Sequence, residues 1–323
     1  MREWVRTVLT VGVDVGGTNI QVGLVDDDHA VVGRAKRPTP ASGPAEVVDA
    51  ILDAVAEASG HGEDVAAVGI GIPGAVHDGE VVHVPNLAGW GDAVDIRAPL
   101  GKALGVPVVL GNDANVGLLG EWLAGAARGH DDVLGLWLGT GIGGGLILHG
   151  RPYNGSFGAA GEIGHVIIRA GGALCSCGRR GCIEAYAGRR TMAATARAMV
   201  DAGRSTDLFD IQQDEGKERP TSKVWARALE EEDELTTQLF DAAIDAIAVG
   251  VGSVVNLLDV ALVVVGGGMA EKLGQDLADR ILEASRPWML HPNPDLTFAV
   301  STLGDDAGVV GAASLARAEV ISG

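Results

Sequence analysis

Three cysteines and one histidine form the most specific chemical pattern in the sequence. His165, Cys175, Cys177 and Cys182 are spaced as H-x9-C-x-C-x4-C, and the chain of 323 residues has 3 cysteines in all. Three thiolates and an imidazole are the soft ligands that hold zinc in a tetrahedral site. Free buried thiols are one alternative, and a disulfide using two of the three cysteines is another. The pattern predicts a structural zinc site, because the protein fills all four positions.

Two glycine-rich turns have residues suited to binding phosphate. In "VGVDVGGTNIQVGLV" we expect a strand at 11–15, a turn and a strand at 20–25, and "LGTGIGGGLILHG" contains Gly139-x-Gly141-x-x-Gly144. A dinucleotide-binding loop with this spacing needs a helix after it, but the residues that follow are typical of a second strand. Neither turn has the Gly-Lys-Ser/Thr of a P-loop. Both turns therefore predict β-hairpins whose backbone N–H groups are open to a phosphate.

Asp14 places a carboxylate inside the first apolar strand, directly before the first glycine turn. Burying a carboxylate is costly unless it meets a metal ion or hydrogen-bond donors. The position predicts either a metal ligand or an acceptor for the amides of the turn.

Strands and helices alternate along the chain, which indicates an α/β protein. The long apolar stretch 239–259 is typical of a core helix and leads into the strand of "VALVVVGGGMA". Residues 205–223 lack clear periodicity, and we expect a weakly structured surface connection there. The other expected elements are a strand meander to residue 40, a helix from Pro44, a strand in "VAAVGIGIPGAV", a strand before Asn112, a helix from Ala114, a hairpin at 133–150 and helices from Glu184 onward.

Composition limits the classes of function. With 323 residues and 47% hydrophobic content, the chain can form two domains. Its net charge of −19 argues against nucleic acid or an anionic membrane as a partner. We find no apolar run near the ~20 residues of a membrane span and no signal-peptide pattern, so we expect a cytoplasmic protein.

Several motifs occur in an order that resembles the ROK family of sugar kinases and related repressors. They are "DVGGTN", "GND", "GEIGH", "CSCGRRGCIEAYAG" and "VVVGGG". The resemblance implies the actin-like ATPase (ribonuclease H-like) fold, with two α/β domains around a cleft. It places a small domain at 1–115, completed by a C-terminal helix at 305–323, and a large domain with the zinc loop at 116–304. Family repressors have an additional N-terminal helix-turn-helix, whereas this chain reaches its first hairpin within about fifteen residues, which favours a kinase over a DNA-binding regulator.

The same resemblance implies a sugar site. Asp113 would be the general base, because a carboxylate held against a hydroxyl can accept its proton during phosphoryl transfer. Capping of the following helix is the other role expected for Asp113. A zinc ion would fix the neighbouring acids, and His165 would bind metal through one nitrogen and sugar through the other. The implied sugar ligands are Gly74, Asn86, Asn112, Asp113, Glu162, His165 and Glu184; Asn112 could equally be a turn residue, and the two glutamates surface acids.

For the phosphoryl donor, the resemblance implies ATP between the two hairpins, with Asp14 holding Mg²⁺ through water. Many relatives have Lys or Arg after the Thr of the first turn, whereas this chain has Asn19, so a basic phosphate contact is absent or comes from elsewhere. For Gly266, Gly267 and Gly268, which end the strand of "VVVGGG", close packing at a strand–helix turn is the alternative role. The implied contacts are Gly16, Gly17, Thr18 and Asn19 from the first turn, Thr140 and Gly141 from the second, and Gly266, Gly267 and Gly268 beside adenosine.

The implied activity is ATP-dependent phosphorylation of a hexose at its 6-hydroxyl, with glucose as the first expectation. The alternatives are a kinase for N-acetylmannosamine, N-acetylglucosamine, mannose or fructose, and a sugar-sensing regulator without catalysis. We expect a homodimer or homotetramer.

Overall fold

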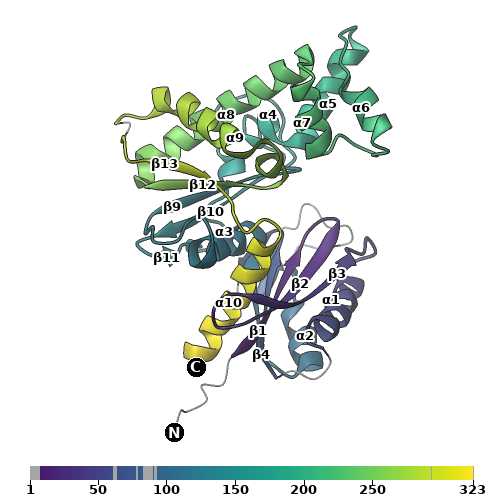
Figure 1. Cartoon of the computed structure of the whole chain (residues 1–323), viewed down its shortest axis with the longest axis vertical. Helices are drawn as coiled ribbons and strands as arrows, with labels where there is room; N and C mark the ends of the chain where they lie inside the picture. The colour runs from purple at the N-terminus through teal and green to yellow at the C-terminus, as the bar shows by residue number, and fades with distance from the viewer. Residues whose placement is uncertain are drawn as a thin grey trace.

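The computed structural model describes residues 8–60, 64–77, 79–82, 90, 93–291 and 293–322. Within these ranges the chain forms two five-stranded sheets, with helices packed around them, and a small three-stranded sheet. Figure 1 shows the two large sheets in separate halves of the molecule, with the C-terminal helix beside the N-terminal strands. The predicted α/β class is confirmed.

The first sheet has the order β3-β2-β1-β4-β8. Its antiparallel meander of β1, β2 and β3 follows the predicted pattern, β4 pairs in parallel with β1, and β8 pairs in parallel with β4. The strands are β1 Leu9–Val15, β2 Asn19–Val25, β3 Val31–Pro38, β4 Val65–Ile72 and β8 Val108–Asn112, and α1 Pro44–Ala58 and α2 Arg97–Leu104 pack against them. The small sheet consists of β5 Ala75–His77, β6 Glu80–Val82 and β7 Ala93–Val94.

The C-terminal helix α10, Asp306–Ser322, packs directly on β1 and β4. A Cβ at Gly12 would lie 1.8 Å from the carbonyl oxygen of Val309, and one at Gly69 would lie 1.8 Å from that of Ala312. The backbones touch because both strand positions lack a side chain. The last helix of the chain is therefore part of the layer that covers the first sheet. The exact domain boundaries near residue 115 stay a prediction.

The second sheet has the order β11-β10-β9-β12-β13. The antiparallel hairpin of β9 and β10 confirms the prediction that a strand, and no helix, follows the Gly139-x-Gly141 turn. β12 and β13 run parallel to β9. The strands are β9 Val133–Leu138, β10 Ile142–Leu148, β11 Arg151–Pro152, β12 Leu262–Gly266 and β13 Thr297–Val300.

The prediction of a weakly structured segment at 205–223 is wrong. It contains α6, Leu208–Asp214, and the start of α7, Ser222–Glu230. Leu208 and Ile211 are buried in the core of the second half, and a helix of 7 residues is too short to produce a clear period in the sequence. The other helices of this half are α4 Glu184–Ala187, α5 Arg189–Asp201, α8 Glu234–Leu258, α9 Gly268–Ser285 and the short 3₁₀ turns η1 Ile163–His165 and η2 Arg286–Trp288.

Helix α8 is long and apolar enough to span a membrane by length and composition, which corrects the expectation that no such stretch exists. Half of its most apolar window is buried inside the fold. Its buried side chains, such as Phe240, Ile247 and Val251, belong to the core of the second half. The composition of α8 is thus that of a core helix.

Helix α3, Asp113–Ala124, connects the two halves. A Cβ at Gly311 of α10 would lie 1.7 Å from the carbonyl oxygen of Val116, so α3 and α10 are in backbone contact. The buried carboxylate of Glu121 accepts hydrogen bonds from Ser301 Oγ at 2.5 Å and from the backbone N–H of Leu303 at 2.8 Å. Glu121 therefore fixes the end of α3 to the segment that leads from β13 into α10.

Candidate active site

Three parallel strands of the first sheet bring the polar residues together at their carboxyl ends. Asp14 of β1 lies opposite Gly71 of β4, and Ile72 of β4 lies opposite Asn112 of β8. The carboxyl edge of a parallel α/β sheet is where ligands commonly bind, because loops and helix N-termini meet there. Sheet register therefore aligns Asp14 with the Asn112–Asp113 pair, although about a hundred residues separate them in the sequence.

Asn112 is the N-cap of α3, because its Oδ1 accepts a hydrogen bond from the backbone N–H of Asn115 at 3.1 Å. Its Nδ2 donates to the carbonyl oxygen of Gly74 and to Oδ1 of Asp113, each at 3.1 Å. Oδ1 of Asp113 also accepts a hydrogen bond from the backbone N–H of Ala114 at 2.9 Å. The expectation that Asp113 caps the helix is therefore wrong, because Asn112 accepts from the first turn of α3 and Asp113 is the first residue of the helix.

The Asp113 carboxyl has a raised pKa. This pKa is about 6 instead of 3.8, mainly because burial raises it; the charge of Glu162 also raises it, and the hydrogen bonds from Ala114 and Asn112 lower it. Glu162 is exposed and directly precedes η1, so it comes from the second half of the chain. A carboxyl with this pKa is ionised at neutral pH and is still a strong enough base to take a proton.

The Asp14 carboxyl has a pKa raised to about 7, first by burial and then by the charges of Asp113 and Asp305. A Cβ at Gly308 in α10 would lie 2.7 Å from this carboxylate, so the first turn of the helix packs against it. The alternative that Asp14 accepts from the amides of its turn is wrong, since no donor among the described residues hydrogen-bonds to it and Gly16 N–H donates to Asn19. A cation is the partner that this environment favours.

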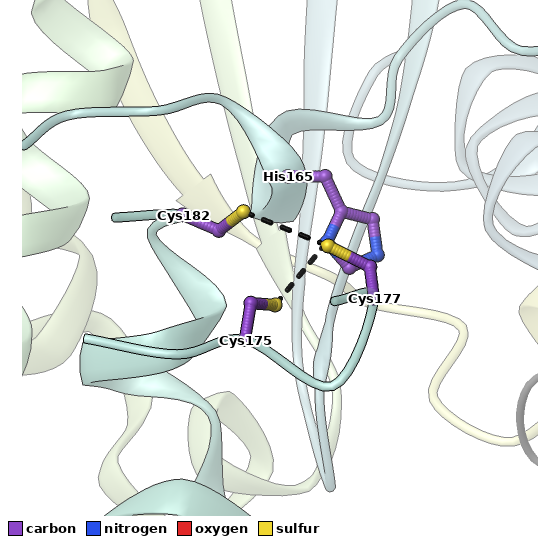
Figure 2. Close-up of side chains that lie close together, drawn as sticks. All are labelled: His165, Cys175, Cys177 and Cys182. Atoms are coloured by element: carbon purple, nitrogen blue, oxygen red, sulfur yellow. Dashed lines mark hydrogen bonds between the residues drawn. The ribbon is translucent and has the colours of Figure 1, made fainter. Parts of the chain in front are cut away.

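His165, Cys175, Cys177 and Cys182 converge in space, as their spacing predicts, and their ligand atoms lie within 4.8 Å of one another. We call these residues the Cys/His cluster (Figure 2). The Sγ atoms of Cys177 and Cys182 are 3.7 Å apart, and Cys175 Sγ is 3.7 Å from His165 Nδ1. A tetrahedron with Zn–S bonds of about 2.3 Å has edges of about 3.8 Å, so the geometry fits zinc. Nδ1 faces the thiols, which leaves Nε2 for another partner.

Two thiols of the cluster have pKa values shifted in opposite directions, since burial and the neighbouring thiols raise the pKa of Cys182 to about 12. Burial raises the pKa of Cys177, but the Arg179 side chain, 3.4 Å from the sulfur, the Arg179 backbone N–H and the neighbouring thiols lower it to about 6 overall. A thiolate, and not a thiol, is the form that binds metals.

Glu184 joins the Cys/His cluster to the second hairpin. Its Oε2 accepts from the backbone N–H of Ile142 at 2.9 Å, and its Oε1 accepts from Ser176 Oγ at 2.7 Å. A Cβ at Gly141 would lie 2.2 Å from Oε2, so the hairpin must have glycine there. The expectation that Glu184 is simply a surface acid is wrong, and its role as a sugar ligand stays a prediction.

The glycine-rich turns have few side chains, so their main chain is accessible. In the first turn, Gly17 and Thr18 are exposed, while Thr39 Oγ1 donates to the Gly16 carbonyl at 2.6 Å and closes the base of the turn. At the end of β12, Gly267 has a φ of 83°, and a Cβ there would lie 2.7 Å from the carbonyl oxygen of Leu138. Gly266–Gly268 and the second hairpin are therefore in contact, and packing alone explains the glycine at 267.

Arg189 was not among the residues predicted from the sequence. It begins α5, directly after Gly188, and its Nη2 donates to Thr140 Oγ1 at 3.2 Å. Beside it is a pocket of about 300 Å³. The only sequence signal was the Arg189-Arg190 pair shortly after Glu184. Asn86, a predicted sugar ligand, lies outside the described residues.

The comparisons with known proteins agree over nearly the whole chain. The model of the ROK family matches residues 10–319. The glucokinase of Thermotoga maritima is 34% identical over 318 residues, which are 96% of this chain and 98% of that enzyme. The N-acetylgalactosamine kinase of a Shewanella species is 30% identical over 315 residues, 94% of this chain and 95% of that one.

A solved structure supports the same conclusion. The ROK family glucokinase from Streptomyces griseus, in complex with glucose and AMPPNP, matches with a TM-score of 0.83 at 36% identity, and the match covers 96% of this chain and 99% of that one. The predicted actin-like ATPase fold is confirmed. This chain belongs to the ROK family.

Proposed function

We propose that this protein is a hexose kinase that transfers the γ-phosphoryl group of ATP to the 6-hydroxyl of glucose. The observation that carries the proposal is Asp113, a half-buried residue at the carboxyl end of β8 whose carboxyl has a pKa of about 6, accepts from Asn112 and is affected by the charge of Glu162. The similarity to glucokinases over nearly the full length supports the reaction class.

In the proposed reaction, the 6-hydroxyl oxygen bonds to the γ-phosphorus while the bond to the β–γ bridging oxygen breaks and ADP leaves. The hydroxyl proton passes to Oδ2 of Asp113, because its Oδ1 is occupied by Asn112 and Ala114. The sugar would be positioned by polar groups at the end of β8 and around the Cys/His cluster. We assign these roles to Gly74, Asn112, Glu162, His165 Nε2 and Glu184.

The donor would lie along the glycine turns, whose N–H groups can face phosphate oxygens. Asp14 lies on the same edge of the first sheet as Asp113, and we assign it to Mg²⁺, bound through water. When bound, the ion neutralises charge on the transferred group. The proposed donor contacts are Gly16, Gly17, Thr18, Asn19, Thr140, Gly141, Gly266, Gly267 and Gly268.

We also propose that the Cys/His cluster binds one structural zinc ion. Four soft ligand atoms within 4.8 Å of one another support this assignment, as do the two separations of 3.7 Å between them. The ion would hold the loop of Cys175–Cys177 rigid, and Ser176 would in turn hold Glu184.

A coupled assay of ADP release tests the proposed function. The purified protein is supplied with Mg²⁺ and ATP, and with glucose, mannose, fructose, N-acetylglucosamine, N-acetylmannosamine or N-acetylgalactosamine. With polyphosphate as donor, which releases no ADP, formation of the sugar phosphate is measured instead. We expect the largest kcat/KM for ATP with glucose. A protein that phosphorylates none of these hexoses is not the enzyme proposed.

A second candidate is a kinase for an N-acetylated hexose, which the Shewanella relative supports. One pocket favours it, a space of about 100 Å³ next to Asn112 that is lined in part by Val76, Asn115 and Asn154. Such a mixture of amide and apolar groups suits an acetamido substituent. A larger kcat/KM for an N-acetylated sugar than for glucose would favour this candidate.

A further inference from the structure

Arg189 is a half-buried cation fixed to the tip of the second hairpin. Its Nη2 donates to Thr140 Oγ1 at 3.2 Å, and its Nη1 donates to Ser222 Oγ. Its backbone N–H donates to the carbonyl oxygen of Gly139 at 3.4 Å, and that of Arg190 donates to Thr140 at 3.0 Å. Both the backbone and the side chain therefore hold the guanidinium against the hairpin.

No carboxylate among the described residues pairs with Arg189. Burial lowers the pKa of its guanidinium, and the nearby positive charge of Arg219 lowers it further. The chain has 43 acidic residues and 24 Lys and Arg, so carboxylates are abundant elsewhere. A partly buried cation without an anionic partner is unfavourable by itself, and it becomes favourable when an anion binds.

The two glycine turns that would hold the donor contain no cation of their own. Residues 16–19 are Gly-Gly-Thr-Asn and residues 139–141 are Gly-Thr-Gly. Backbone N–H groups supply only partial charges, whereas charge-assisted hydrogen bonds to phosphate are roughly twice as strong as neutral ones. A triphosphate in contact with these turns alone would lack a full positive charge from the protein.

Arg189 also lies beside the N-terminus of α9. A Cβ at Gly268 would lie 3.8 Å from Arg189 Nη1 and 2.7 Å from Ser222 Oγ. Non-helical backbone angles at Gly274 divide α9, so only residues 268–273 form the helical segment next to Arg189. The hairpin tip, the start of α9 and the guanidinium meet at one place, which we call the positive corner because of the charge of Arg189.

The adjoining pocket of about 300 Å³ continues this positive corner. Thr140 and Arg189 line the pocket on the side of the hairpin. Three more arginines line it, with Glu218 as the one acid among the described lining residues: Arg190, Arg197 and Arg219. The guanidinium carbon of Arg197 lies 3.5 Å from the centre of the Phe209 ring. In a chain of net charge −19, this is a local excess of positive charge.

We propose that Arg189 binds the phosphate chain of the phosphoryl donor and supplies the positive charge that the two glycine turns lack. A guanidinium has five N–H donors, and Thr140 and Ser222 use two of them, so three N–H donors are left for phosphate oxygens. The inference rests on the proposed kinase function and specifies how that site holds its donor. Arg189 is a binding residue and takes no part in proton transfer.

The test is isothermal titration calorimetry with three probes, ADP, inorganic tripolyphosphate and adenosine, on the full-length protein. The variants are Arg189→Gln and Arg189→Lys. Arg197→Gln is the matched control, because it removes an equal charge from the same pocket lining but not from the hairpin. Thermal unfolding of each variant reports whether the fold is kept.

We expect Arg189→Gln to bind ADP and tripolyphosphate about tenfold or more weakly, with adenosine binding unchanged. Arg189→Lys should recover part of the loss, because a point charge replaces some of the guanidinium contacts. Arg197→Gln should change ADP binding by less than about threefold, since an exposed charge is screened.

Three results would overturn the inference: unchanged ADP binding by Arg189→Gln, a similar loss for adenosine, or an equal loss of ADP affinity in Arg197→Gln. Calorimetry needs no turnover, so its outcome is separate from the activity of the wild-type protein. A wild-type protein that binds ADP through Arg189 but phosphorylates no hexose would contradict the proposed function and not this inference.

Discussion

The carboxylate of Glu184 accepts a hydrogen bond from the backbone N–H of Ile142 at 2.9 Å, at the first residue of β10 after the second glycine turn. Its other oxygen accepts from Ser176, between two cysteines of the Cys/His cluster. One side chain therefore positions both the loop assigned to the sugar and the turn assigned to the donor. Changes at this point should affect both substrates.

We expect Glu184→Gln to raise KM for the sugar and KM for ATP together, each by about tenfold, because an amide cannot accept at both positions. Steady-state kinetics with each substrate varied in turn would measure this. Glu162→Gln is the matched control, since Glu162 is exposed and has no such link to the hairpin, and it should raise KM for the sugar alone. An unchanged KM for ATP in Glu184→Gln would show that the hairpin does not depend on this hydrogen bond.

Asp113→Asn should lower kcat by at least about 10²-fold while sugar binding is kept, because only the proton acceptor is removed. The wild-type kcat/KM should also fall about tenfold per pH unit below about pH 6, the pKa to which burial raises Asp113. Rate profiles between pH 5 and 8 measure both effects. Asp210→Asn, at an exposed position in α6, is the control and should behave as wild type.

The same substitution should stabilise the protein at high pH. The folded-state pKa of Asp113 is about 6, above the ordinary value of 3.8, so between these two values the unfolded chain loses this proton while the folded protein keeps it. Stability therefore decreases between about pH 4 and pH 6, and the full penalty is on the order of 3 kcal/mol. Asp113→Asn should unfold a few degrees higher than wild type at pH 8 and at the same temperature near pH 4. A lower Tm at pH 8 would contradict the burial effect.

Asp14→Asn should lower Mg²⁺-dependent turnover by about 10²-fold or more, since it removes the charge assigned to the cation. Glucose affinity, measured by calorimetry without nucleotide, should stay within about twofold, because the carboxylate is on the donor side of the site. Asp28→Asn, in the exposed loop after β2, is the control. A normal kcat with a normal Mg²⁺ requirement would show that Asp14 has only a structural role.

Purified protein should contain about one zinc per chain, measured by inductively coupled plasma mass spectrometry, and Cys177→Ser should lose it. Without the ion, Ser176 would no longer be held against Glu184, so both substrates should bind more weakly and thermal stability should fall. Leu174→Ala, next to the cluster and exposed, should keep the metal. Fully active wild-type protein without zinc would exclude the structural metal.

Much of the site could be predicted from the local sequence. The spacing of His165, Cys175 and Cys177 is short, and a loop that brings such ligands together needs few long-range contacts. The hairpin at Gly139–Gly141 follows from the local sequence, because the residues after the turn form a short apolar run that ends in His149-Gly150 and is typical of a strand. Capping of α3 by Asp113, one of two roles expected for that residue, is wrong, because Asn112 and Asp113 are both good caps and only the folded backbone shows that the helix begins at Asp113.

The sequence by itself determined the α/β class, the two glycine hairpins and the four residues of the cluster, because each depends on residues close together in the chain. Only the tertiary structure decided which distant groups meet. The packing of α10 on Gly12, the hydrogen bond from Ile142 to Glu184 and the position of Arg189 beside Thr140 and Ser222 all join separate segments. The raised pKa of Asp14 has the same origin, since burial and the charges of Asp113 and Asp305 exist only after the strands and the last helix pack.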